Sequence, residues 1–382
     1  AAAAVLVRTD WNYAQTRLAA WEKEFANQPD FLEALAEHYR DNGPLVKAEA
    51  ALKRVIDVAP DVWRYRDLAR VYRSLGDTDG YVQTLEKALE QPEMGLAHTR
   101  VRVELARHFM DKKEWDTALS YAREAARSYS GDSLECLADC YEAMGDLERA
   151  EEWVRKCAER YQQTGYEWFF WCKRTGVGDV EAAARLAKES LESKSGEQST
   201  LAETTGVFLL LSRETAKAVD VFRTDFDRNH NPYTGLHCAL LLDESGDHQG
   251  CEWTLQAIVE RGERYKSGGE ILSQEIDLAH LMQTAIADNG KLKIDAVESL
   301  IKRAGDAEGT NLEYFVGRFL ELHGEKEHGR EFLLRAARSA STNKYNHILA
   351  CDRLRRQGVK LDTQPAESQP AASQPSGARQ QS

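Results

Sequence analysis

The sequence predicts an all-α protein built from repeated pairs of antiparallel helices. Apolar residues recur with a helical period of about 3.6 residues along most of the chain. Glycine recurs at an equivalent place between successive segments, and the prolines before the C-terminal tail fall between segments or in turns. A single helix hairpin cannot bury its apolar face alone, so consecutive hairpins are expected to stack into a solenoid.

The clearest copy of this unit spans residues 133–161. Its two segments each place apolar residues on one helical face: Leu137, Ala138 and Tyr141 in the first, and Leu147, Ala150, Val154 and Cys157 in the second. Gly145 lies where a helix commonly ends in a left-handed residue, which glycine adopts without steric cost. Asp146 follows, where its side chain can cap the next helix. We therefore expect a helix, a tight turn and an antiparallel helix.

This pattern resembles the tetratricopeptide repeat (TPR). The family's motif places Leu-Gly/Ala and Tyr in the first helix, Gly-Asp in the turn, and an aromatic residue, Ala and further apolar residues in the second. The matching positions are Leu137-Ala138, Tyr141, Gly145-Asp146, Leu147, Ala150, Val154 and Cys157, while the closing Pro is missing. The resemblance implies a right-handed α-solenoid of about nine TPR-like hairpins followed by a C-terminal capping helix.

The repeats are expected to follow one another along the chain. Residues 1–29 form a partial repeat with only its second helix, from Trp11 to Pro29, its partner being lost or reduced to the few residues before Arg8. TPR-like repeats fill residues 30–341, with copies near 30–60, 63–93, 99–130, 133–161, 166–194, 199–230, 232–262 and 311–341 and a degenerate one at 271–304. The turn glycines are Gly43, Gly76, Gly145, Gly178, Gly246 and Gly324, while Lys113 and Arg213 replace glycine in two turns.

The C-terminal part is expected to contain one helix and a tail. Residues 342–358 hold a capping helix from Tyr345 to Gln357, whose polar outer face is formed by Arg353, Arg355 and Arg356. Residues 359–382 repeat Gln-Pro and have no large apolar residue after Leu361, so a disordered tail is predicted.

Composition narrows the classes of partner. A net charge of −13 argues against a general nucleic-acid or anionic-membrane binder. No apolar run is long enough for a membrane helix, and the opening AAAAVLV is too short for a signal peptide. Most of the seven cysteines lie at helix-packing positions, so we expect buried free thiols, which favours a reducing compartment such as the cytoplasm.

The first helices of the second and third full repeats would line the concave side with a basic patch. Its residues are Trp63, Arg66, Arg70, Arg73, Arg100 and Arg107. One interpretation is a clamp for an acidic peptide, because arginine binds carboxylates bidentately, with flanking acids such as Glu33 and Glu37 setting the orientation. The other is a solvated face whose arginines pair with acids on neighbouring helices, for example Glu86 or Glu104.

Later repeats would line the concave side with an apolar stripe. Its residues are Trp168, Val207, Leu210, Leu236 and Leu240. An exposed stripe of this kind could receive an amphipathic partner helix. The alternative is that tighter superhelical closure or a self-dimer buries these residues.

Signals for catalysis are poor. No nucleophile, base and orienting residue form a recognisable set, and no cofactor is expected. Cys136, Cys140 and Cys157 could suggest metal ligands, but their spacing favours packing. We therefore predict a non-enzymatic scaffold or adaptor that binds a protein or peptide on its concave surface. The alternative is a regulatory or non-catalytic segment of a larger enzyme or multiprotein assembly.

Overall fold

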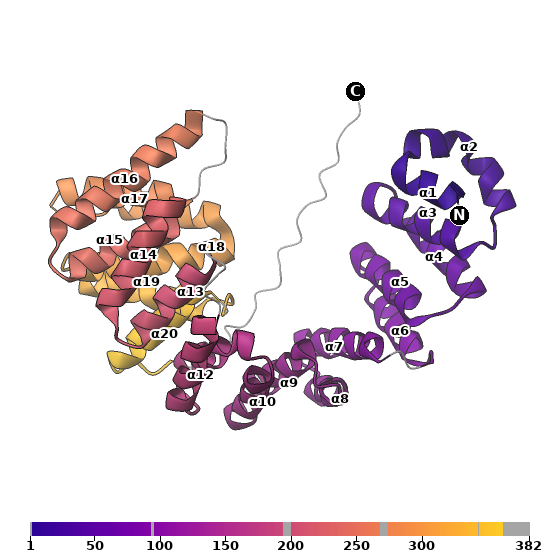
Figure 1. Cartoon of the computed structure of the whole chain (residues 1–382), viewed down its shortest axis with the longest axis horizontal. Coiled ribbons are helices and arrows are strands. Elements are labelled where there is room, and N and C mark those ends of the chain that lie inside the picture. Colours follow the sequence, from indigo (N-terminus) through magenta and orange to yellow (C-terminus); the bar gives the residue numbers. More distant parts are fainter. Residues whose placement is uncertain are drawn as a thin grey trace. The chain divides into compact units, whose positions relative to one another are not determined.

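A computed structural model describes residues 2–92, 95–193, 200–267, 274–289, 291–342 and 344–361. In those ranges every regular element is a helix, α1–α20 and the short 3-10 helix η1, as predicted (Figure 1). The chain divides into two compact units, unit 1 (Ala1–Met144) and unit 2 (Gly145–Ser382). No described helix is both long and apolar enough to cross a membrane. The predicted tail lies outside the described residues from position 362 onward.

Unit 1 is a stack of helix hairpins. Its helices are α1 (Ala2–Thr9), α2 (Trp11–Glu24), α3 (Pro29–Asn42), α4 (Leu45–Val58), α5 (Val62–Leu75), α6 (Thr78–Leu89), α7 (Leu96–Asp111), α8 (Trp115–Ala126) and α9 (Gly131–Ala143). The pairs α3–α4, α5–α6 and α7–α8 coincide with the first three full repeats expected from the sequence. Helices α5 and α7 also contact each other, and α7 contacts α9, so these helices lie next to one another along the stack.

The N-terminal region contains two helices, α1 and α2. The sequence predicted the second helix of a repeat with its partner either lost or reduced to the few residues before Arg8, and α1 occupies those residues. Helix α1 packs against α3 and buries Ala3, Ala4 and Val7. A run of alanines has little amphipathic contrast, so the pattern alone left both alternatives open.

Unit 2 continues the same kind of hairpin. Its helices are α10 (Leu147–Arg160), η1 (Gln162–Thr164), α11 (Tyr166–Thr175), α12 (Val180–Ser193), α13 (Thr200–Leu211), α14 (Thr215–Asn229), α15 (Pro232–Glu244), α16 (His248–Ser267), α17 (Gln274–Ala287), α18 (Ile294–Leu322), α19 (Lys326–Arg338) and α20 (Tyr345–Arg356). Gly305 has non-helical dihedral angles and divides α18 into two parts. Helix α17 with the first part of α18 occupies the predicted degenerate repeat, of which Ile271 and Gly290 lie outside the described residues.

Most turns keep a left-handed residue even where the sequence departs from glycine. Five of the six turn glycines have φ between +77° and +96°: Gly76, Gly145, Gly178, Gly246 and Gly324. Gly43 is extended, because the proline that follows it disfavours helical angles. Lys113 and Arg213 adopt φ of +60° and +68° although a Cβ makes that conformation costly by about 1–2 kcal/mol. Packing of the hairpins therefore dictates these two turns.

Helices α18 and α19 approach each other through two glycines. A Cβ placed on Gly329 would lie 2.7 Å from the carbonyl oxygen of Gly317 and 2.9 Å from the backbone nitrogen of Glu321. Both neighbours are backbone atoms, so a side chain here would force the two helices apart.

We predict that Gly329→Ala lowers the free energy of unfolding by about 1–3 kcal/mol, because it overpacks this contact. Gly309→Ala on the same helix as Gly317 is the control, since its Cβ would meet Ile301 Cγ2 at an ordinary 3.4 Å. The control should be neutral or more stable by up to about 1 kcal/mol through helix propensity. Urea denaturation of both variants measures this, and equal stabilities would contradict the proposed close approach.

Candidate partner-binding site

Trp63 is a large aromatic side chain that unit 1 exposes on α5. It lies near the start of α5 and is 39% exposed. The guanidinium carbon of Arg66 lies 5.7 Å from the centroid of its ring, and that of Arg100, on α7, lies 5.6 Å away. Both distances are in the range of cation–π interactions. We call Trp63, Arg66 and Arg100 the Trp63 platform.

Three of the predicted patch arginines already have acidic partners. Arg66 donates to Glu104 across α5 and α7 at 2.6 Å, and both side chains are largely buried. Arg107 binds Asp132 at 2.6 Å. Arg70 pairs more loosely with Asp67 at 3.4 Å. For these arginines the structure agrees with pairing between neighbouring helices, and Glu104 is one of the partners expected.

The other two arginines have more freedom. Arg100 is exposed, and its guanidinium makes no ion pair with any residue that the structure describes. Arg73 is also exposed and lies 5.8 Å from the centroid of the Tyr81 ring. Glu86, the second acid proposed as an arginine partner, instead accepts a hydrogen bond from Tyr121 at 3.3 Å. Arg73 and Arg100 are therefore the members of the patch best placed to meet a new carboxylate.

An acidic cavity of about 270 Å³ adjoins the platform. Its charged lining comes from α3, α5 and the residue before α5: Glu33, Glu37, Asp61 and Asp67 with Arg40 and Arg64. Arg64 lies 2.6 Å from both Glu33 and Asp61, so part of the negative charge is neutralised. Burial raises the pKa of Asp67, against the opposing effect of Arg70 and Arg40. Sequence reasoning singled out Glu33 and Glu37 but missed Asp61 and Asp67, although Asp67 lies one turn after Trp63.

The apolar stripe expected in unit 2 is not an open surface. Trp168, Val207, Leu236 and Leu240 are each at most 4% exposed, and Leu210 is half-buried. Helix α20 packs against α11 and α13, and α18 packs against α15, so neighbouring helices cover the stripe. The proposal that these residues receive a partner helix is therefore wrong for this structure, and the alternative of burial by tighter closure holds.

Helix α20 packs on the last hairpin, as expected for a capping helix. Its arginines, however, bond to other helices instead of facing only solvent. Arg355 donates to the backbone carbonyl of Lys173, 182 residues earlier in the chain, at 2.9 Å. Arg353 donates to Glu321 at 2.6 Å. Local periodicity could not reveal these contacts, because each joins helices far apart in sequence.

Buried polar groups hold α20 in place. Asn346 Oδ1 accepts hydrogen bonds from the Tyr233 hydroxyl and from His237 Nε2, each at 3.0 Å. Its Nδ2 donates to the Asn311 carbonyl at 3.2 Å. The Tyr345 hydroxyl lies 2.7 Å from Thr204 Oγ1. Because a buried amide left without partners is costly, these bonds favour one position of α20.

The cysteines behave as packing residues. All seven are free and buried, as the spacing predicted. Burial raises the pKa of Cys136 to about 12 and that of Cys140 to about 11, so both stay protonated near neutral pH. Within the described ranges, no group of three or more His, Cys, Asp or Glu side chains is placed to hold a metal ion.

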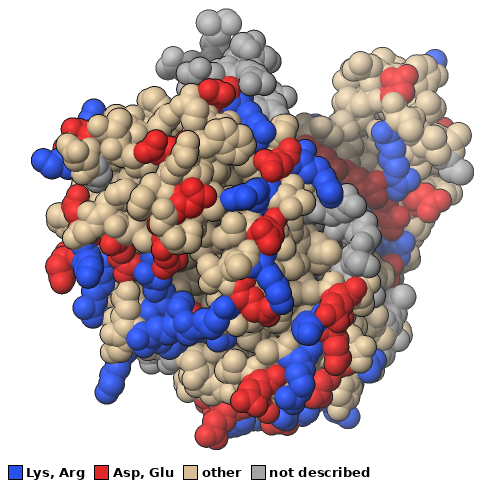
Figure 2. Space-filling model, turned by 60° about the vertical axis from the view of Figure 1, so that its left-hand side comes forward, with Lys and Arg blue, Asp and Glu red and all other residues tan. Residues whose placement is uncertain are grey.

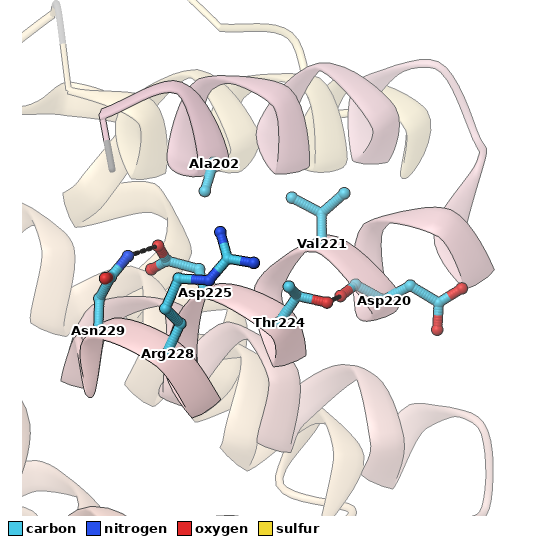
Figure 3. Close-up of a pocket in the computed structure, with 7 residues that line it drawn as sticks. All are labelled: Ala202, Asp220, Val221, Thr224, Asp225, Arg228 and Asn229. Carbon is cyan, nitrogen blue, oxygen red and sulfur yellow. Dashed lines mark hydrogen bonds between the residues drawn. The ribbon is translucent and has the colours of Figure 1, made fainter. Parts of the chain in front are cut away.

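A cavity of about 260 Å³ lies between α13 and α14, and Ala202 and Val221 are among the residues that line it (Figure 3). Asp225 accepts from Asn229 at 2.7 Å and from Thr234 at 2.9 Å. Both oxygens of Asp225 are thus used within unit 2, and this carboxylate joins α14 to the start of α15 rather than offering a ligand site.

The burial of His237 predicts that unit 2 loses stability at acidic pH. Burial lowers the pKa of His237 to about 3, the Asn346 hydrogen bond opposing this and Arg318 adding to it. The folded state keeps the ring neutral, whereas the unfolded chain binds a proton below about pH 6.5, so stability falls as the pH drops from there. Between about pH 7 and about pH 5 this group should cost about 2 kcal/mol.

His237→Phe should remove that part of the pH dependence, since phenylalanine fits among the surrounding rings of Phe222, Tyr233 and Phe315. Urea denaturation at both pH values gives the comparison, with His280→Gln on the surface of α17 as the control. If His237→Phe and the native chain lose equal stability on acidification, His237 is not the responsible group.

Comparisons with known proteins give one family match in the sequence and several structural similarities. A family model of the tetratricopeptide repeat matches residues 136–164. A search of curated proteins finds no significant match. The crystal structure of MamA is 17% identical at a TM-score of 0.35, covering 41% of this chain and 91% of that one. The C-terminal part of a TPR repeat-containing protein from Cytophaga hutchinsonii is 13% identical at 0.40, covering 68% and 93%.

Yeast Tom70 is 13% identical at a TM-score of 0.36, covering 93% of this chain and 88% of that one. Structural similarity at these levels carries no inference about partners. The chain therefore contains a tetratricopeptide repeat at residues 136–164, within an array of helix hairpins.

Proposed function

We propose that the chain is a protein-interaction scaffold or adaptor and that unit 1 binds an extended partner segment on the face formed by α3, α5 and α7. The observation that carries this is the Trp63 platform, where a large aromatic side chain is 39% exposed beside two guanidinium groups. Tryptophan and arginine dominate binding energy in many protein interfaces. Tetratricopeptide-repeat proteins generally mediate protein–protein interactions and are generally non-catalytic.

The charges around Trp63 suggest the chemistry of the partner. Arg100 and Arg73 can each donate two hydrogen bonds to a carboxylate of the partner in bidentate geometry. The Trp63 ring, which lines the acidic cavity and lies next to Arg100, offers an apolar or stacking surface. The acidic cavity suits a lysine or arginine side chain, because its carboxylates outnumber its arginines. A segment with acidic residues at one end and a basic residue at the other would therefore bind in one direction.

Trp63→Ala should weaken partner binding by about 2 kcal/mol or more, about thirtyfold, because it removes the central apolar contact. Trp253→Ala is the matched control, since Trp253 lies on α16 of unit 2 and is 60% exposed. Cross-linking and mass spectrometry from native extract would identify the partner, and calorimetric titration with the recovered partner would measure affinity. Equal affinities of the two variants would reject the platform as the binding site.

Arg100→Glu tests the charge of the partner. Reversal should weaken binding of an acidic segment, while stability should change little because Arg100 is exposed and makes no ion pair with a described residue. Arg66 is less suitable, because its reversal would break the largely buried pair with Glu104. Arg127→Glu, directly after α8, is the control, since Arg127 is 76% exposed. Tighter binding by Arg100→Glu would indicate a basic partner and contradict the proposal.

A further inference from the structure

Unit 2 contains a second cavity, of about 290 Å³, whose lining is unusually rich in arginine. Four guanidinium groups border it, those of Arg213, Arg318, Arg353 and Arg356, together with Tyr314 and Glu244. They come from the α13–α14 turn, α15, α18 and α20. We call it the arginine cavity. Figure 2 shows that Lys and Arg also form contiguous patches on one face of this acidic chain, beside Asp and Glu.

Two of these arginines are held by carboxylates. The Arg318 side chain is 4% exposed and lies 2.8 Å from Glu244 and 3.1 Å from Glu321. Arg353 lies 2.6 Å from the same Glu321. This network ties α15, α18 and α20 together and fixes one wall of the cavity.

The remaining positive charge is not balanced. Arg213 forms no side-chain hydrogen bond or ion pair with any described residue, although the α13–α14 turn holds its backbone in the left-handed region. Arg356 has one carboxylate partner, Asp352, at 2.7 Å. Lys173 of α11 approaches that same carboxylate at 3.8 Å, so a single acid serves two cations.

The pKa values are consistent with this crowding of positive charge. Burial lowers the pKa of Arg356, and the nearby Arg213 and Arg353 lower it further despite Asp352. Burial also lowers the pKa of Lys173, with Arg213 and Arg356 adding to the effect. Across the cluster, five cationic side chains meet three carboxylates, Glu244, Glu321 and Asp352, which leaves an excess of two positive charges.

We propose that the arginine cavity binds a small ligand through an oxyanion, a phosphate or a carboxylate group. Arg213 and Arg356 would contact the oxyanion, because guanidinium groups bind such groups in bidentate geometry. Among the four arginines that border the cavity, the positive charge of these two is the least neutralised by carboxylates of the described residues. Leu210, Leu241 and Leu349 supply an apolar wall for the uncharged part of the ligand. The volume lies near the lower end of the range for small-molecule sites.

The site depends on helix α20. Arg353, Arg356 and Leu349 all lie on α20, so the cavity exists only while this helix is packed inside unit 2. An oxyanion that neutralises the excess charge would stabilise the packed helix. Binding is therefore expected to raise the melting temperature of the chain.

Inorganic pyrophosphate and citrate, titrated calorimetrically into the full chain at neutral pH and constant ionic strength, test the proposal. At least one of them should bind at a single saturable site, and the stronger probe distinguishes a phosphate from a carboxylate ligand. Absence of saturable binding by both probes would overturn the proposal.

Arg213→Gly is the informative variant. Glycine adopts the left-handed turn without the Cβ penalty, so the variant should fold at least as well while losing the charge. Lys113→Gly makes the same substitution at the corresponding turn of unit 1 and is the matched control. We expect affinity for the bound probe to fall at least about tenfold in Arg213→Gly and to stay unchanged in Lys113→Gly.

Arg356→Gln provides a second test on α20. It should also weaken binding, and in both arginine variants the rise in melting temperature caused by the probe should be smaller than in the native chain. Unchanged affinity in Arg213→Gly and Arg356→Gln, or an equal loss in Lys113→Gly, would show that the anion binds elsewhere.

Discussion

A helix hairpin cannot cover its own apolar face, and both units are shaped by how that face is covered. In unit 1 each hairpin packs on the next, through α4 with α5 and α6 with α7. The inner sides of α3 and α5 then keep a cavity and a half-exposed tryptophan. In unit 2 the chain supplies its own cover, because α20 packs against helices from the first and last hairpins of the unit.

The two candidate sites differ because hairpins of unit 1 pack on their neighbours, whereas α20 packs across several hairpins of unit 2. The Trp63 platform combines an exposed tryptophan ring and the exposed Arg100 with Arg66, which also pairs with Glu104 between α5 and α7. The arginine cavity of unit 2 forms only when α20 is packed, because α20 places its own arginines next to Arg213 and Arg318. Both polar side-chain atoms of Asn346 are hydrogen-bonded. These directional bonds favour one position of α20, which apolar packing alone would not specify.

The local sequence pattern predicted the features that depend on residues close together in the chain. The helix pairs, the left-handed turns and the buried cysteines follow from periodicity and from glycine placement. Contacts between distant helices were not predictable in the same way. The inward orientation of Arg355 depends on Lys173, and Leu236 is buried although its position in the repeat faces the inner side. For the candidate site, the sequence placed Trp63 and its arginines, and it offered Glu104 as a partner without deciding between pairing and clamping.

The contact between Arg355 and the Lys173 carbonyl has a consequence for cooperativity. In an open repeat array each hairpin touches only its neighbours, so unfolding can start at an end and proceed one hairpin at a time. Unit 2 joins its last helix to an early one, which couples the two ends of the array. Fraying at the C-terminal end would uncover α11 and α13 at once, so this unit should behave as a single folding block rather than as a row of semi-independent modules.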